Sequence, residues 1–368
     1  MSPRNFAILA LATVASVALA VHAVALRDVP VQSEVVGEAL FPGLLDRLND
    51  VRGVRVTGHD AKLTVNEVDG RWVLAEKSSY PVDAATVRNL ALALANLQLV
   101  EAKTADPARL PRLELDDPGA NDAKSHLVEL LGADGQPVAA AVVGKSSPSL
   151  YGGGRGGVYV RRAAESQAWL AAGEIEVPGD AMALLPHEVV DLPMAEVAKI
   201  TLQPTGAPAL TLSRADAAGE FTADAALPEG RKLDPVKLEA LAGTLAGLTM
   251  SDVRPAAELT PPADAPHARF QTFDGLVVEG TLVREGEGDA AQNWLLVKAS
   301  ADETAPVTAP ADPAATEAAP APETKKPAER AAEIATRVDG WAYQIPPYLA
   351  ERFDDNLEKL LAEPTPAS

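Results

Sequence analysis

The chain has 368 residues and is 47% hydrophobic, which is enough for two ordinary domains that each bury a core. Its formal net charge of −20 argues against binding to nucleic acid or to an anionic lipid surface, because phosphate groups require clustered Lys and Arg. Cysteine is absent, which excludes disulfides, thiolate nucleophiles and Cys-ligated zinc.

The chain begins with a short tail, residues 1–5, and an uncharged apolar run, residues 6–26. A run of about 20 residues is long enough to cross a bilayer and exceeds the apolar region of most cleavable signal peptides. We therefore predict a cytoplasmic tail and a transmembrane anchor, or uncleaved signal, of a single-pass bacterial inner-membrane protein whose body lies in the periplasm. The alternative is a cleaved signal that ends at the small residues 18–20 or 23–25.

Residues 27–50 are a predicted connector, and a first α+β unit is predicted over residues 51–180. It opens with Val-rich and Leu-rich runs separated by turn residues such as Asp69-Gly70, a pattern typical of strands and hairpins. A capped helix is then predicted from Asp83, because apolar residues follow at three-and-four spacing on one face: Val87, Leu90, Leu94 and Leu97.

The rest of the first unit is predicted to have a proline-rich loop at 106–122 and then three strands. The Asp134-Gly135 turn separates the first strand from the second, and a glycine-rich stretch separates the second from the third. The segment 165–173, ESQAWLAAG, is predicted as a short helix.

A second unit, residues 190–368, repeats this order. Its strands end at Phe221, where the first unit has Trp72, and a helix follows from Asp234 with Leu238, Leu241, Leu245 and Leu248 on one face. The turn Asp274-Gly275 then matches Asp134-Gly135. We therefore predict an α+β fold: two similar, mainly antiparallel sheet-plus-helix units in tandem after one N-terminal transmembrane helix.

The second unit is interrupted at residues 299–329 by a segment rich in Ala and Pro, which is predicted to be disordered. Aromatic and apolar residues then return at Trp341, Tyr343, Ile345, Tyr348 and Phe353. They are expected to pack back onto the second unit, and the alternative is an aromatic binding surface.

Two stretches are candidate ligand-binding loops. Gly144-Lys145-Ser146 lacks the earlier glycine of a phosphate-binding loop, since residue 139 is Ala, and is predicted to be a strand end. The glycine-rich stretch 152–157 lies between strands, with Tyr151, Arg155 and Tyr159 as candidate residues for an anionic ligand or a partner. The alternative there is a flexible connection between two strands.

Other site chemistry has little support in the sequence. Acidic residues cluster within 114–122 and 285–289, but neither stretch has the alternation of an EF-hand, so solvated loops are predicted. Histidines have no zinc-binding spacing and no GxSxG motif is present. We therefore assign no catalytic, cofactor-binding or metal-binding residue and expect no cofactor.

The order of these motifs resembles a known family. GRWVL, YPVDAATVRNLALALANLQLVEA, VVGKSSP, GGVYVRR and ESQAWLA, followed by a repeat ending in GWAYQIPPYLAERF, are similar to the bacterial domain-of-unknown-function 4340 family. The resemblance implies a membrane-anchored periplasmic protein, often encoded beside components of gliding-type ABC transporters. The family has no established catalytic residues, so none is carried over.

The leading hypothesis is a non-catalytic, membrane-anchored periplasmic accessory or binding protein of an ABC-type envelope transport complex. Its expected partners are permease or ATPase subunits, together with the inner membrane through residues 6–26. The alternatives are a periplasmic hydrolase acting on an envelope glycan or peptide through an unrecognised acidic site, and a structural spacer.

Overall fold

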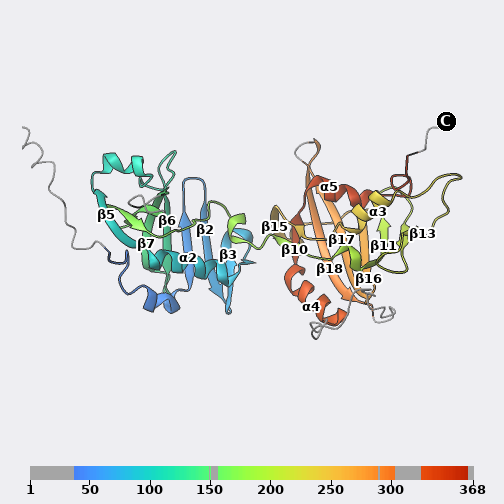
Figure 1. The fold of residues 1–368 in the computed structure, drawn as a ribbon, viewed down its shortest axis with the longest axis horizontal. Coiled ribbons are helices and arrows are strands. Elements are labelled where there is room, and N and C mark those ends of the chain that lie inside the picture. The colour runs from blue at the N-terminus through green and yellow to red at the C-terminus, as the bar shows by residue number, and fades with distance from the viewer. Residues whose placement is uncertain (1–36, 149, 151–155, 289–290, 303–324, 364–368) are drawn as a thin grey trace, which may run out of the picture. The chain divides into compact units, whose positions relative to one another are not determined.

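The computed structural model describes residues 37–148, 150, 156–288, 291–302 and 325–363 (Figure 1). The predicted tail and anchor, residues 1–26, lie outside this set, as does most of the predicted insertion. No helix among the described residues is long and apolar enough to span a membrane. The chain forms two compact units, one of residues up to Thr64 with Ala85–Gly179, and one of Val65–Ala84 with residues from Asp180 onward.

The first sheet has nine strands in the order β4-β3-β2-β1-β6-β7-β8-β9-β5. Its strands pair in the antiparallel manner, which confirms the predicted α+β class with mainly antiparallel sheets. The strands are β1 Gly53–Thr57, β2 Lys62–Val68, β3 Arg71–Leu74, β4 Tyr80–Pro81, β5 Gln98–Thr104, β6 His126–Leu131, β7 Pro137–Ser147, β8 Gly157–Arg162 and β9 Ala168–Ala172.

The helix predicted from Asp83 is α2, Ala84–Asn96, which lies across strands of the first sheet (Figure 1). It buries Val87, Leu90 and Leu94, as its apolar spacing predicts. The predicted turn at Asp134-Gly135 joins β6 to β7, with Gly135 at φ 73°. Turn chemistry and helical period therefore gave correct elements in this part of the chain.

The predicted helix at 165–173 is wrong. Residues Ala168–Ala172 form β9, which pairs with β8 on one side and with β5 on the other. Four of its five residues are buried, so the strand is apolar on both faces and shows no alternation. Periodicity cannot separate such a short buried strand from a helix.

The second sheet has eight strands in the order β13-β12-β11-β16-β17-β18-β19-β15, and β10 and β14 form a separate pair. Setting β4 aside, this order corresponds strand for strand to that of the first sheet. The strands are β10 Glu188–Val190, β11 Val197–Gln203, β12 Leu210–Ser213, β13 Thr222–Ala223, β14 Leu248–Thr249, β15 Asp252–Pro255, β16 His267–Thr272, β17 Leu276–Glu285, β18 Gln292–Ala301 and β19 Trp341–Gln344.

The helix predicted from Asp234 is α3, Pro235–Ala242, and the Asp234 carboxylate accepts a hydrogen bond from the Val236 amide at 3.0 Å. The helix is shorter than α2. Leu245 and Leu248 follow its end, yet both are buried as their spacing predicts.

The remaining helices are α4, Pro327–Val338, which is nearly as long as α2, and several short turns. The short elements are α5 Pro347–Ala350 and the 3-10 turns η1 Leu45–Asp50, η2 Ala75–Lys77, η3 Pro107–Leu113, η4 Met182–Leu184, η5 Met194–Glu196, η6 Ala256–Glu258 and η8 Glu351–Asp354. The C-terminal aromatic segment packs onto the second sheet, because β19 pairs with β18 and β15. Tyr343 and Phe353 are buried, whereas Tyr348 is 60% exposed.

Each sheet has a segment that crosses one of its faces. In the first sheet β5 ends at Thr104, opposite Ala168, and the chain re-enters the sheet at His126, opposite Val143. The connection, residues 105–125, runs from the edge strand β5 over the face of β9, β8 and β7 to β6. We call it the first crossing segment, and the corresponding connection 256–266, between β15 and β16, the second crossing segment.

Candidate functional site

The first crossing segment packs on a small apolar cluster on the first sheet. Leu110 and Leu115 are buried against Val142 and Ala168, and Tyr159 is half-buried beside them. Of the three predicted ligand-loop residues, only this tyrosine is among the described residues, since Tyr151 and Arg155 lie outside them. Tyr159 lies on β8, so its ring is held by a strand and by the crossing segment.

A β-bulge lies directly opposite Tyr159. Val143 pairs with Val160 and Ser146 with Val158, so Gly144 and Lys145 together oppose the tyrosine. Bulges re-aim side chains and are common beside functional sites. Here the ammonium of Lys145 lies 5.7 Å from the centroid of the Tyr159 ring. Gly144-Lys145-Ser146 is thus part of β7, as predicted, but it contains a feature that the strand pattern did not show.

The crossing segment approaches β7 so closely that position 144 must be a glycine. A Cβ atom at this position would lie 2.6 Å from the carbonyl oxygen of Glu114 and even closer to that of Leu113. Both obstacles are backbone atoms, so no side chain can turn away to make room. The absence of a side chain at Gly144 therefore lets the end of η3 rest on β7.

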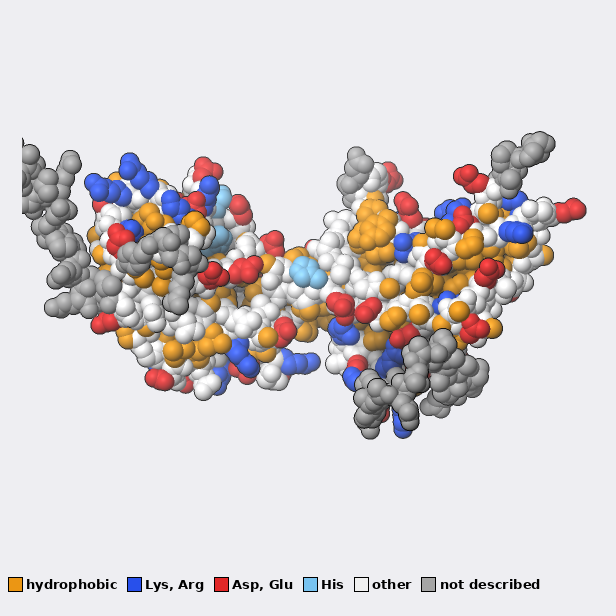
Figure 2. Space-filling model, viewed as in Figure 1, with side chains coloured by type: hydrophobic (Ala, Val, Ile, Leu, Met, Phe, Trp, Pro, Cys, Tyr) orange, Lys and Arg blue, Asp and Glu red, His pale blue; other side chains and the backbone are white. Residues whose placement is uncertain are grey.

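Cationic side chains gather where η3 meets β7. Lys145 donates a hydrogen bond from Nζ to the carbonyl oxygen of Arg112 at 2.6 Å. Arg109 and Arg112 are three residues apart in a 3-10 helix, which places them on one side of it. In Figure 2 the Lys and Arg side chains cluster over the teal turn that Figure 1 draws for η3. We call Arg109, Arg112 and Lys145 the cationic patch.

Some cations on the first crossing segment and its sheet are already used. Arg109 forms an ion pair with Asp106 at 3.4 Å, and Lys124 lies 3.9 Å from Glu114. Arg161 donates from Nε to the carbonyl oxygen of Leu115 at 3.0 Å, and burial lowers the pKa of its guanidinium while Asp117 and Asp116 raise it. The Arg161 contact fastens the crossing segment to the sheet, and the two ion pairs lie within the segment.

His126 opens β6 at the same end of the sheet. Burial lowers the pKa of its imidazole, because a charged ring would lose solvation there. A Cβ on Gly58, in the adjacent turn, would lie 3.0 Å from its Cδ2 atom. The ring is therefore packed into the sheet end and favours its neutral form.

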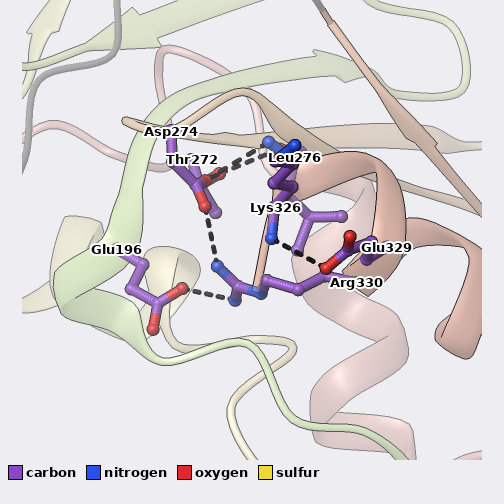
Figure 3. A network of polar contacts seen from close by, with 7 residues as sticks. All are labelled: Glu196, Thr272, Asp274, Leu276, Lys326, Glu329 and Arg330. Atoms are coloured by element: carbon purple, nitrogen blue, oxygen red, sulfur yellow. Dashed lines mark hydrogen bonds and ion pairs between the residues drawn. The ribbon is translucent and has the colours of Figure 1, made fainter. Parts of the chain in front are cut away.

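The second unit has a polar network centred on Arg330 of α4 (Figure 3). Its guanidinium reaches Glu196, at the end of η5, at 2.5 Å, and Asp274, in the β16–β17 turn, at 3.0 Å. Asp274 also accepts hydrogen bonds from the Thr272 hydroxyl and, at 3.4 Å, from the Leu276 amide. Although burial alone lowers the pKa of Arg330, the two carboxylates outweigh it and raise that pKa. The network fastens α4 to the sheet.

One further carboxyl group has a perturbed pKa. Burial raises the pKa of Asp355, Asp354 and Glu351 add to the rise, and Lys359 and Arg352 oppose it. The neighbouring Asp354 forms an ion pair with Arg284 at 2.5 Å. Of these two neighbouring carboxyl groups, Asp354 is therefore held by a cation at the end of η8.

Metal binding was not predicted, and the described residues contain no group of three or more His, Asp or Glu side chains arranged to hold a metal ion. In the acidic stretch 114–122, Asp117 caps its own turn by accepting a hydrogen bond from the Gly119 amide at 3.0 Å. Asp289 of the second acidic stretch lies outside the described residues.

Comparison with known proteins gives one match. A family model described as Domain of unknown function (DUF4340) matches residues 72–271, which are 200 of the 368 residues. No curated protein and no solved structure matches the chain. The matched range includes the cationic patch and Tyr159, and it ends within β16.

Proposed function

The chain belongs to the DUF4340 family, and from that premise we propose that it is a membrane-anchored periplasmic accessory or binding protein and not an enzyme. The family description names no activity. The binding role is argued below from the residues of this chain, whereas the place in a transport complex is what the family resemblance implies. Its expected place is an ABC-type envelope transport complex, with permease or ATPase subunits as partners.

The proposed location and membrane topology depend on the N-terminal sequence. Residues 6–26 are apolar and uncharged and are proposed to anchor the chain in the inner membrane, with residues 27–368 in the periplasm. A protease added to spheroplasts is expected to digest a C-terminally tagged chain while the inner membrane remains intact. Complete protection of the tag until detergent is added would contradict this topology.

We also propose that the two sheets arose by tandem duplication of one sheet-plus-helix unit. The support is their common strand order, with a helix after the third strand position of each sheet and a crossing segment before β6 and before β16. A repeated scaffold of this kind keeps its strands while its connections change, which suits a protein that binds partners through loops.

The observation that carries the binding role is a contrast in how charged side chains are used. Arg330, Arg284 and Arg214 make contacts within the second unit: two pair with carboxylates, and the third donates to backbone oxygens. Arg112 and Lys145 are instead exposed, and neither forms an ion pair with a carboxylate of the described residues, although the Lys145 ammonium also donates to the carbonyl oxygen of Arg112. An exposed charge that no carboxylate neutralises is available for a ligand or partner.

The test is recovery of the complex. The tagged full-length chain is crosslinked in cells, solubilised in detergent and purified, and the expected result is that an ABC permease or ATPase subunit copurifies. A variant with Arg88→Gln, an exposed position on α2, serves as a matched surface control for any patch variant. Recovery of the chain alone after efficient crosslinking would refute the proposed association.

The alternative was a hydrolase with an acidic site. It calls for two carboxyl groups with raised pKa values in one pocket. Among the described residues, Asp355 has a raised pKa but its neighbour Asp354 is held by Arg284. This arrangement does not favour hydrolysis, and we propose a single function.

A further inference from the structure

We propose that Arg112 and Lys145 form a subsite for a phosphate group carried by a soluble molecule. The inference builds on the proposed binding role and names the chemistry of one ligand. It begins with the two charges: both side chains are exposed, and within the described residues no carboxylate forms an ion pair with either of them.

The charge of Lys145 lies against the backbone of Arg112. The Lys145 ammonium lies 2.6 Å from the carbonyl oxygen of Arg112, so the arginine side chain leaves the backbone beside it. Like charges on neighbouring exposed side chains repel each other, and an anion that contacts both removes that repulsion. In a chain of net charge −20, acidic side chains outnumber basic ones, so most cations are expected to lie near a carboxylate. An exposed pair of cations is therefore unusual in this chain.

The subsite is rigid on the Lys145 side. The bulge at Gly144 and Lys145 aims the lysine over the Tyr159 ring at 5.7 Å from its centroid. Tyr159 rests on the apolar cluster of Leu110, Leu115 and Val142, and the end of η3 is pressed onto Gly144. The lysine therefore loses little additional freedom when an anion binds.

The chemistry of the pair fits phosphate. A guanidinium offers a planar fork of donors, and an ammonium offers a compact charge with rotating donors. A phosphate ester has several acceptor oxygens and up to two negative charges, so it can satisfy both groups at once. A soluble ester and a lipid headgroup offer the same phosphate chemistry, and the vesicle arm of the test below separates the two.

The test uses the full-length chain in detergent at low ionic strength, titrated with glycerol 3-phosphate and with inorganic phosphate in a calorimeter. Lys145→Gln keeps a donor for the Arg112 carbonyl and removes the charge, and Arg112→Gln removes the other charge. Saturable binding is expected for the natural chain, and each variant should weaken it about tenfold. Added salt should weaken binding to the natural chain as well.

Arg88→Gln is the matched control, because it removes one exposed charge from the same unit. It should change the affinity by less than about twofold. The proposal is overturned if the natural chain shows no saturable binding, if Arg88→Gln weakens binding as much as the patch variants, or if only phosphatidylglycerol vesicles bind. Hydrogen exchange of β7, unchanged in each variant, establishes that the sheet is intact.

This outcome is separate from that of the transport proposal. A chain that copurifies with a permease but does not bind glycerol 3-phosphate refutes the subsite alone. A chain that binds the phosphate ester through Arg112 and Lys145 but copurifies with no transporter subunit supports the subsite and refutes the association.

Discussion

The first and second sheets arrange their strands in the same order, once β4 is set aside, but differ in the segments that connect those strands. The first crossing segment, residues 105–125, is longer than the second, residues 256–266. The second sheet instead has α4 between β18 and β19, where the first has only residues 163–167 between β8 and β9. Strand order is thus common to the two sheets, and their individual chemistry lies in the connections.

Each sheet has an aromatic ring beside a cation in the apolar cluster under its crossing segment, although the two cations come from different strand positions, β7 and β15. In the first sheet it is Tyr159 with Lys145, and in the second it is Trp294 with Arg254, whose guanidinium lies 4.0 Å from the indole centroid. Arg254 is also bound to Glu285 at 2.6 Å, which closes the second position. The cation beside the ring is therefore neutralised by a carboxylate in the second sheet and is exposed in the first.

The largest expected effect on stability comes from alanine substitutions at two glycines, Gly144 on β7 and Gly280 on the corresponding strand β17. Gly144→Ala should destabilise the first unit by about 3 kcal/mol, because the new Cβ meets backbone oxygens of Leu113 and Glu114. Gly280→Ala should cost about 1 to 2 kcal/mol, since its Cβ meets the Phe353 ring at 2.7 Å, and a side chain can shift. Urea unfolding followed by hydrogen exchange of each unit measures both.

Gly179→Ala is the control for this pair, since nothing lies within 4 Å of its Cβ position. It should change the free energy of unfolding by less than about 0.5 kcal/mol. If Gly280→Ala proves more destabilising than Gly144→Ala, the crossing segment is not pressed onto β7 as described.

The next effect concerns α4, which the first sheet lacks. Arg330→Met should destabilise the second unit by about 1 to 2 kcal/mol, because it removes two ion pairs and leaves two carboxylates facing each other. The side chains are partly exposed, at 24% for Arg330 and 38% for Glu196, so solvent limits the loss. Faster hydrogen exchange should appear in α4 and should not appear in α2.

Lys325→Gln provides the comparison for this variant. Its ion pair with Glu333 is exposed on both sides and should contribute less than about 0.5 kcal/mol. Equal effects of the two substitutions would mean that the Arg330 network does not fasten the helix.

Much of this architecture is visible in the sequence, because short turns and helix starts are encoded locally. The turns at Asp134-Gly135 and Asp274-Gly275 join paired strands, and the helices after Asp83 and Asp234 form and bury the predicted apolar residues that lie within them, although the predicted Leu97, Leu245 and Leu248 follow the helix ends. The segment at Ala168–Ala172 was predicted incorrectly because its conformation is not encoded locally. Its conformation depends on two partner strands that lie far away in the sequence.

The candidate site was only partly predictable. The sequence pointed to Tyr159 but gave no reason to pair it with Lys145, because the bulge that brings them together depends on the register of β7 and β8. Nothing local in residues 105–125 shows that Arg112 will lie against β7. Only the glycine at 144, within an otherwise apolar strand, was a signal of close backbone approach.

A smaller effect is expected from the two cation and ring pairs. Arg254→Met should destabilise the second unit by about 1 kcal/mol, since it removes a close stack over Trp294 and the ion pair with Glu285. Lys145→Met should cost the first unit less than about 0.5 kcal/mol, because its ammonium is 5.7 Å from the Tyr159 centroid and exposed. Thermal unfolding with unit-specific hydrogen exchange compares them. Equal losses would remove the distinction between a closed and an open position.

The smallest effect is a pH dependence confined to the first sheet. Burial lowers the pKa of His126 from its ordinary 6.5, so the unfolded chain binds a proton more readily than the folded chain in the window below that value. Stability contributed by the neutral ring is therefore present above pH 6.5 and is lost as the pH falls through the folded pKa. His126→Gln should flatten the pH dependence of hydrogen exchange in β6 below pH 6.5. An unchanged slope would mean that the ring is solvated, and the sheet end at Gly58 would then be more open than its packing indicates.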